Sequence, residues 1–161
     1  MPTEGQKPPA SPRIVNRKAR HDYHILESLE VGIALQGSEV KSVRNGQVSL
    51  AEGYALADPR SLELFLYDVD IAPYDKAHGA DAHEPKRVRK LLAHRREIVR
   101  LQDRCAAKGT TLVPLTMYFV RGKVKLELGL GLGKKAHDKR QTLKTRDAER
   151  QMRQGMTRRS L

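Results

Sequence analysis

The run Gly129-Leu-Gly-Leu-Gly133-Lys134 has the composition of a loop that holds phosphate groups. A nucleotide-hydrolase loop needs glycine at position 128 and serine or threonine at 135, where this chain has Leu128 and Lys135. A dinucleotide-binding loop needs a third glycine at 134 and a helix directly after it. Because these glycines alternate with leucines in a strand pattern, we interpret the run as a packing feature.

The six histidines include two close pairs, His21 with His24 and His78 with His83. Neither pair has a carboxylate or thiolate at the offset that metal sites use, so we expect ordinary surface or RNA-contacting histidines. The single cysteine, Cys105, lies on the apolar side of a predicted helix, which favours buried packing and excludes an intramolecular disulfide. No G-x-S-x-G motif places a nucleophilic serine. We therefore expect no catalytic residue, no metal site and no cofactor.

The charge balance is the clearest global signal. The 161 residues include 31 Lys+Arg and 19 Asp+Glu, a net charge of +12. Such an excess favours a polyanionic partner, of which nucleic acid is the commonest and an anionic membrane surface the alternative. The purest apolar run, residues 117–120, is far shorter than the roughly 20 residues of a membrane span. We therefore expect a cytoplasmic protein with no membrane partner.

Composition divides the chain into three parts. Residues 1–12 contain four prolines and are expected to form a disordered leader. Residues 13–132 contain all seven aromatic residues and are expected to form the folded domain. Residues 133–161 carry ten Lys/Arg against three acids, and their few apolar residues lie only loosely along one helical face. We expect this basic tail to be unfolded when free and to become helical against a partner.

The elements that must position any site are mostly strands. Alternating apolar residues predict a long strand over 23–35, and further strands are predicted over 48–57 and 61–72. Residues 111–120 and 123–132 read as a hairpin about Arg121-Gly122. A short helix over 37–46, capped by Ser38 and ended by Asn45-Gly46, and a longer helix over 86–108 complete the folded part. The predicted fold class is α+β, mainly β: an OB-fold-like antiparallel barrel with about three helices and a disordered basic tail.

Four blocks resemble the SmpB family of SsrA-binding proteins: NRKARHDYHI (16–25), EVGIALQGSEVKSVR (30–44), RVRKLLAHRREI (87–98) and GKKAHDKR (133–140). The resemblance implies an OB-type barrel and a function without catalysis. It implies binding to the tRNA-like part of tmRNA, promotion of its aminoacylation, and delivery of alanyl-tmRNA to stalled ribosomes in trans-translation. The implied partners are tmRNA and small-subunit rRNA directly, and EF-Tu·GTP and alanyl-tRNA synthetase through tmRNA.

The resemblance also implies a tmRNA-binding surface on the barrel. Glu30 cannot bind phosphate, so it would accept hydrogen bonds from base N–H groups or ribose hydroxyls, or orient an arginine. Glu39 is equally suited to a local pair with an arginine, Tyr54 to base stacking or to the core, and Leu92 to RNA binding or to packing. The full predicted set, including cations and an amide suited to the RNA backbone, is Asn16, Lys18, Glu30, Glu39, Lys41, Arg44, Tyr54, Leu92 and Lys125.

For the tail, the resemblance implies contacts at the ribosomal decoding centre, with His137 stacking on rRNA and the flanking cations neutralising phosphates. The corresponding residues are Gly133, Lys134, Lys135, His137, Asp138, Lys139 and Arg140. Leu132 departs from the family pattern, in which a basic residue often precedes this block. The alternatives to this reading are another OB-fold ribosomal or general RNA-binding protein, and an enzyme that uses RNA as its substrate.

Overall fold

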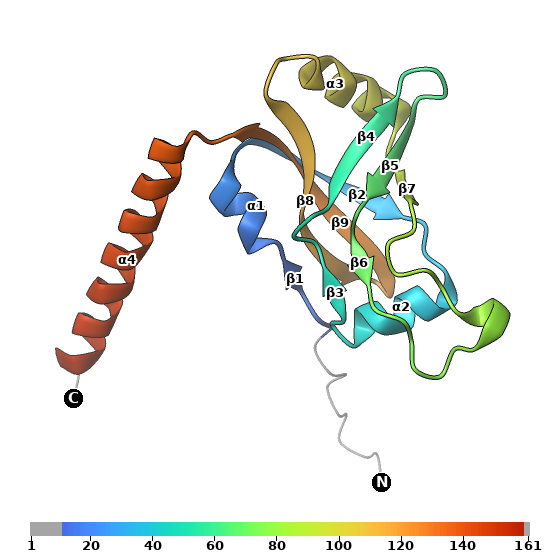
Figure 1. Ribbon diagram of the computed structural model, residues 1–161, viewed down its shortest axis with the longest axis horizontal. Coiled ribbons are helices and arrows are strands. Elements are labelled where there is room, and N and C mark those ends of the chain that lie inside the picture. Colours follow the sequence, from blue (N-terminus) through green and yellow to red (C-terminus); the bar gives the residue numbers. More distant parts are fainter. Residues whose placement is uncertain (1–10, 160–161) are drawn as a thin grey trace, which may run out of the picture.

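The computed structural model describes residues 11–159, so residues 1–10 of the predicted leader lie outside the described part. Figure 1 shows a body of strands and short helices from which one long helix projects. The elements in chain order are β1 (Ile14–Val15), α1 (Arg17–Asp22), β2 (Tyr23–Ile33), α2 (Gly37–Arg44), β3 (Val48–Ser49), β4 (Tyr54–Asp58), β5 (Glu63–Tyr67), β6 (Asp70–Ile71), η1 (Gly79–Asp81), β7 (Arg89–Leu92), α3 (Arg95–Cys105), β8 (Thr110–Val120), β9 (Lys123–Gly133) and α4 (Ala136–Arg159).

The main sheet closes on itself. Its strand order is β1-β8-β4-β5-β7-β2-β9. An additional pairing of β8 with β9 closes the strands from β8 to β9 into a ring of six antiparallel strands, and β1 is attached to β8 outside this ring. The ring encloses a core of aliphatic side chains, among them Leu64, Leu91 and Leu126, each exposed by 1% or less. The predicted α+β class with an OB-like barrel is therefore confirmed.

Two predicted elements agree closely with the structure. The hairpin is present as β8 and β9, which turn at Arg121 and Gly122, both with positive φ. The short helix α2 is present and ends at Asn45, followed by Gly46 at a φ of 70°. Its predicted cap is wrong, because Gln36 is the N-cap residue and the hydroxyl of Ser38 instead contacts the ring of His83.

The long strand is shorter than predicted and contains a bulge. β2 ends at Ile33, and its register against β9 shifts between Ile25 and Glu27. The residue left unpaired by the bulge is Leu26, and Glu27, the polar residue within the apolar alternation, resumes the pairing opposite Leu130. The Glu27 carboxylate is largely covered and forms ion pairs with Arg100 and Arg104 on α3.

The helix predicted over 86–108 is wrong in its first half. Residues 89–92 form β7 between β5 and β2, and α3 begins only at Arg95, after a capping contact in which the Glu97 carboxylate accepts from the backbone N–H of His94. Leu91 therefore faces the barrel core from a strand. The strand predictions over 48–57 and 61–72 are each divided, into β3 with β4 and β5 with β6.

The glycines of β9 are packing positions, as their alternation with leucine indicated. A Cβ atom on Gly129 would lie 2.7 Å from Cδ1 of Leu115, and one on Gly131 would lie 3.0 Å from the ring of Tyr23. These absent side chains make room for a second apolar cluster, in which Ala19, Val113 and Leu115 are buried outside the main core.

Helix α4 projects away from the body in Figure 1, and its side chains are mostly exposed. Leu143 and Met152, from the face on which the sequence placed its apolar residues, are 47% and 68% exposed. The predicted absence of structure in the free tail stays a prediction; the chain is helical here without a core of its own. Within residues 11–159, no helix has the length and apolar character needed to cross a membrane.

Candidate nucleic-acid interface

Three of the predicted tmRNA-binding residues, Glu30, Leu92 and Lys125, come together where β7, β2 and β9 meet. Gly32 is the residue between them, paired with Leu92 on one side and Lys125 on the other. A Cβ atom on Gly32 would lie 3.1 Å from that of Leu92, so glycine lets the leucine lie across the strand. These four residues line one open hollow of about 650 Å³.

The surroundings of this hollow suit RNA better than a small ligand. Leu92 is 53% exposed and lies on the outer side of β7, so it is not a core residue; its side chain packs over Gly32. An exposed aliphatic side chain beside an ammonium group and a carboxylate offers an apolar contact for a base or ribose, a partner for phosphate and a hydrogen-bond acceptor. We call the surface formed by Glu30, Gly32, Leu92 and Lys125 the barrel groove.

Tyr118 on β8 is a member of this surface that the sequence did not reveal. Its hydroxyl donates a hydrogen bond to Oε2 of Glu30, and the guanidinium of Arg13 lies over its ring, 5.2 Å from the centroid. Partial burial and the hydrogen bond to the Glu30 carboxylate raise the pKa of Tyr118 to about 12.

Asn16, at the hollow beside α1, has no side-chain group free to bind a partner. It is 3% exposed; its Nδ2 donates to the carbonyls of Leu50 at 2.9 Å and Pro114 at 2.8 Å, while Oδ1 accepts from the N–H of Ala19. Asn16 thus caps α1 and ties it to the barrel. Its amide is buried and fully used within the protein, so the predicted contact with the RNA backbone gains no support from this geometry and stays a prediction.

Lys18 and Tyr54 line a second, smaller hollow of about 300 Å³ beside α1. The ammonium of Lys18 pairs with Glu52. The hydrogen bond to the Glu52 carboxylate and the negative charge of that carboxylate raise the pKa of Lys18. The ring of Tyr54 stacks on that of Tyr67, with centroids 5.3 Å apart and planes 12° from parallel. Tyr54 is half-buried and one face of its ring is covered by Tyr67, so it is not a core residue, and base stacking by Tyr54 stays a prediction.

Glu39 is buried and belongs to the scaffold. Its carboxylate is 0% exposed and accepts from Arg87 at 2.8 and 2.6 Å, from Nε of Arg89 at 2.8 Å, and from the backbone N–H of Gln36 at 2.8 Å. Burial would raise the pKa of Glu39, but these hydrogen bonds and the charge of Arg89 outweigh it and hold the pKa below its usual value. The local arginine pair considered for Glu39 is therefore present, while its predicted RNA contact gains no support from this buried position and stays a prediction.

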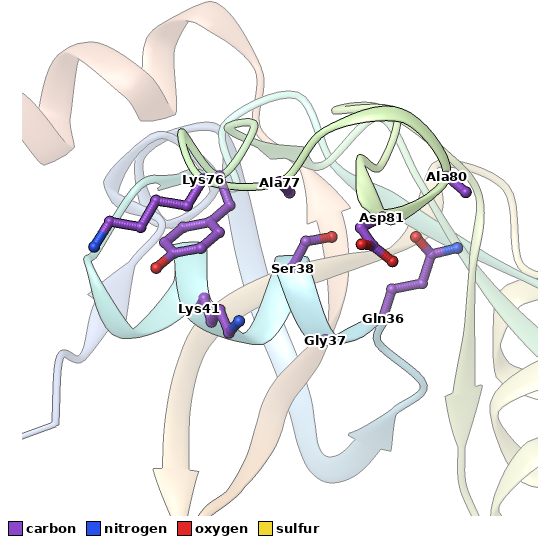
Figure 2. Close-up of a pocket in the computed structure, with 9 residues that line it drawn as sticks. Gln36, Gly37, Ser38, Lys41, Lys76, Ala77, Ala80 and Asp81 are labelled. Carbon is purple, nitrogen blue, oxygen red and sulfur yellow. The ribbon is translucent and has the colours of Figure 1, made fainter.

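Lys41 and Arg44 project from the exposed side of α2, as a role in binding phosphate requires. The ammonium of Lys41 lies 5.1 Å from the ring centroid of Tyr74, and the guanidinium of Arg44 lies 5.8 Å from that of Phe119. Lys41 and Tyr74 both line a third hollow. Figure 2 shows Lys41 on one side of it and Gln36 and Asp81 on the other. The loop that closes this hollow is held by His83, which is 6% exposed and contacts the carbonyl of Ile71 at 2.9 Å.

The predicted decoding-centre residues lie at the end of β9 and the base of α4. The backbone N–H of Lys134 donates to the carbonyl of Asp22 at 2.9 Å, and Nζ of Lys139 lies 3.6 Å from the Asp22 carboxylate. Asp138 contacts the ring of His24 at 3.5 Å, and that hydrogen bond lowers the pKa of Asp138. Lys135, His137 and Arg140 are exposed, while Gly133 ends the strand.

Over residues 11–159, no cluster of three or more histidines, cysteines and carboxylates is arranged to hold a metal ion. Cys105 is partly exposed and packs against the core, and burial raises the pKa of its thiol. The barrel thus combines exposed cations, one exposed carboxylate and one exposed leucine in the groove.

Comparison with known proteins agrees with this description. The sequence profile of the SmpB protein family matches residues 13–158. The SsrA-binding protein of Trichodesmium erythraeum is 53% identical over 137 residues, which cover 85% of this chain and 86% of that protein. The SsrA-binding protein of Chlorobaculum tepidum is 51% identical over 149 residues, 92% of this chain and 93% of that protein.

A solved structure described as "tmRNA-SmpB: a journey to the center of the bacterial ribosome" contains a chain of similar fold. That chain has a TM-score of 0.65 and 50% sequence identity, with coverage of 78% of this chain and 86% of that one. The profile match covers nearly the whole sequence, and both relatives exceed half identity over most of their length. This chain therefore belongs to the SmpB family.

Proposed function

We propose that this protein binds the tRNA-like part of tmRNA through the barrel groove and acts with it in trans-translation on stalled ribosomes. The observation that carries the proposal is the meeting of Glu30, Leu92 and Lys125 around Gly32, from three strands, in a member of the SmpB family. In this arrangement Lys125 binds phosphate, Leu92 packs against a base or ribose, and Glu30 accepts a hydrogen bond from the RNA.

Four further residues of the predicted set, three exposed and one half-buried, extend the RNA-binding surface beyond the barrel groove. Lys18 and Tyr54 are proposed to contact RNA beside α1, and Lys41 and Arg44 from α2. Their positions on different sides of the body favour recognition of a folded RNA, whose backbone passes several basic patches, over binding of a short single strand.

For the tail, we propose a separate role at the decoding centre of the small subunit. Lys135, His137 and Arg140 are exposed at the base of α4, where they can contact rRNA phosphates and bases. EF-Tu·GTP and alanyl-tRNA synthetase are proposed as partners that this protein meets through tmRNA. The proposed work is binding rather than catalysis, in the cytoplasm where ribosomes translate.

The test is binding of the full-length protein to the tRNA-like fragment of tmRNA at physiological salt, against a large excess of ordinary tRNA. Retained binding supports recognition of tmRNA by shape. Complete competition by tRNA would instead favour a general RNA-binding protein that relies on its net charge of +12.

Substitutions locate the surface. Lys125→Ala is expected to weaken fragment binding and to lower the slope of log affinity against log salt by about 1, because one phosphate contact is lost. Glu30→Ala is expected to weaken binding with an unchanged slope. Lys108→Ala, which removes the same charge from an exposed position after α3, is the control and should affect tRNA and tmRNA equally.

A further inference from the structure

Tyr118 and Glu30 meet across an intervening strand. Glu30 on β2 pairs with Glu127 on β9, which pairs with Thr116 on β8, and Tyr118 lies two residues further along β8. The backbones of β2 and β8 are two strand spacings apart, about 10 Å. The tyrosine side chain must therefore extend over the outer face of β9 to donate its hydroxyl hydrogen to Glu30.

The register also places two carboxylates directly opposite one another. Glu30 faces Glu127, a like-charge pair that cross-strand geometry disfavours. Glu127 has a cation nearby, with Nη2 of Arg20 at 3.9 Å. Glu30 instead receives a neutral hydroxyl donor. A neutral donor fixes the carboxylate without cancelling its charge, which a lysine or arginine in the same place would do.

The hydrogen bond uses only one oxygen of Glu30. Tyr118 bonds to Oε2, while Oε1 has no hydrogen-bond partner or ion pair among the described residues. Glu30 is exposed and lines the barrel groove with Leu92 and Lys125. A carboxylate with one oxygen held and the other open presents an oriented acceptor to whatever occupies the groove.

Resting on the function proposed above, we propose that Tyr118 is a positioning residue for tmRNA binding: its hydroxyl holds Glu30 so that Oε1 accepts a hydrogen bond from a ribose hydroxyl or base amino group of the RNA. The ring is itself held by Arg13, whose guanidinium lies over it. Because the Tyr118 pKa is about 12, the hydroxyl remains a donor at neutral pH.

The experiment is a double-mutant cycle on the full-length protein, with affinity for the tRNA-like fragment of tmRNA as the readout. Tyr118→Phe keeps the ring under Arg13 and removes only the hydroxyl. We expect it to weaken binding about three- to tenfold, the effect of losing one charge-assisted hydrogen bond that orients an acceptor, with no change in salt slope. Thr145→Val removes a hydroxyl from α4, away from the barrel, and should change affinity less than about twofold.

The decisive comparison is made in the Glu30→Ala background. If Tyr118 acts through Glu30, Tyr118→Phe has no further effect there, whereas an equal loss in both backgrounds means that the hydroxyl contacts RNA itself and overturns the proposal. Wild-type affinity in Tyr118→Phe also overturns it. Thermal unfolding of each variant shows that the barrel is intact. If the proposed function itself is wrong, the wild-type protein will lose its binding to the fragment when excess tRNA competes. That outcome is distinct from any effect of Tyr118→Phe.

Discussion

Substitution of Glu39 by glutamine is the sharpest test of what holds α2 and β7 together. The carboxylate accepts four hydrogen bonds, three of them from the guanidinium groups of Arg87 and Arg89. Arg89 is also 0% exposed, and its other donors reach backbone carbonyls, including that of Val69 at 2.7 Å. Glutamine keeps the shape, but it removes the only carboxylate paired with Arg89 in the described residues and turns an N–H group toward another donor.

Breaking a buried ion pair by removing one partner costs about 3–5 kcal/mol, because the remaining charge stays buried without compensation. Such a loss is a large part of the roughly 5–15 kcal/mol by which domains are stable. With a urea dependence of about 2 kcal/mol per molar, the unfolding midpoint of Glu39→Gln should fall by about 2 M. Circular dichroism during urea unfolding measures it.

The matched control is Glu63→Gln. Glu63 pairs with Lys90 at 2.6 Å, but both side chains are exposed by more than a third, so we expect a change below about 1 kcal/mol. Equal midpoints for the two variants would refute the reasoning.

The pH dependence of stability adds a second check. The folded-state pKa of Glu39 lies below its ordinary 4.5. The stabilisation that the Glu39 carboxylate contributes is therefore present above pH 4.5 and is lost as the pH falls through the lowered pKa. The gap between wild type and Glu39→Gln should therefore narrow below pH 4.5.

Four other substitutions or modifications test separate features. Gly129→Ala should lower the free energy of unfolding by about 1–3 kcal/mol, measured in urea, because its Cβ would lie 2.7 Å from Leu115. Gly155→Ala places its Cβ in open space on α4, so it should instead increase the helical circular dichroism signal at 222 nm. The thiol of Cys105 should react with a disulfide reagent on the order of tenfold more slowly in the folded protein than in urea, since burial raises its pKa, and equal rates would contradict this. Lys139→Ala should leave affinity for the tRNA-like fragment within about twofold while lowering rescue of stalled ribosomes; a parallel loss of both would count against separate roles for barrel and tail.

Local signals were sufficient for the elements whose sequence pattern and tertiary role agree. In the β8–β9 hairpin, the first half of β9 alternates because one face packs on the core, and the turn has residues with positive φ. Helix α2 ends where Asn45-Gly46 predicts. In the groove, Lys125 was placed on the polar face of its strand from the alternation alone, and the structure has it there.

Other features depend on contacts between distant parts of the chain. Residues 89–92 carry basic and apolar residues at spacings that also suit a helix, but pairing with β2 and β5 makes them a strand. The buried ion pair between Glu39 and Arg89 joins positions fifty residues apart. Tyr118 was missed for the same reason, because its partner lies two strands away and no local spacing reveals it.

Strand β9 fixes the distance between the barrel groove and the start of the tail. It carries Lys125 near one end and Gly133 at the other, and it is paired on both edges, with β2 and with β8. Eight residues of extended strand span about 26 Å, and a strand held on both sides can neither stretch nor slide. The groove and the start of the tail are therefore kept apart by a rigid spacer, so an RNA seated at one end sets the distance at which the other end reaches its target.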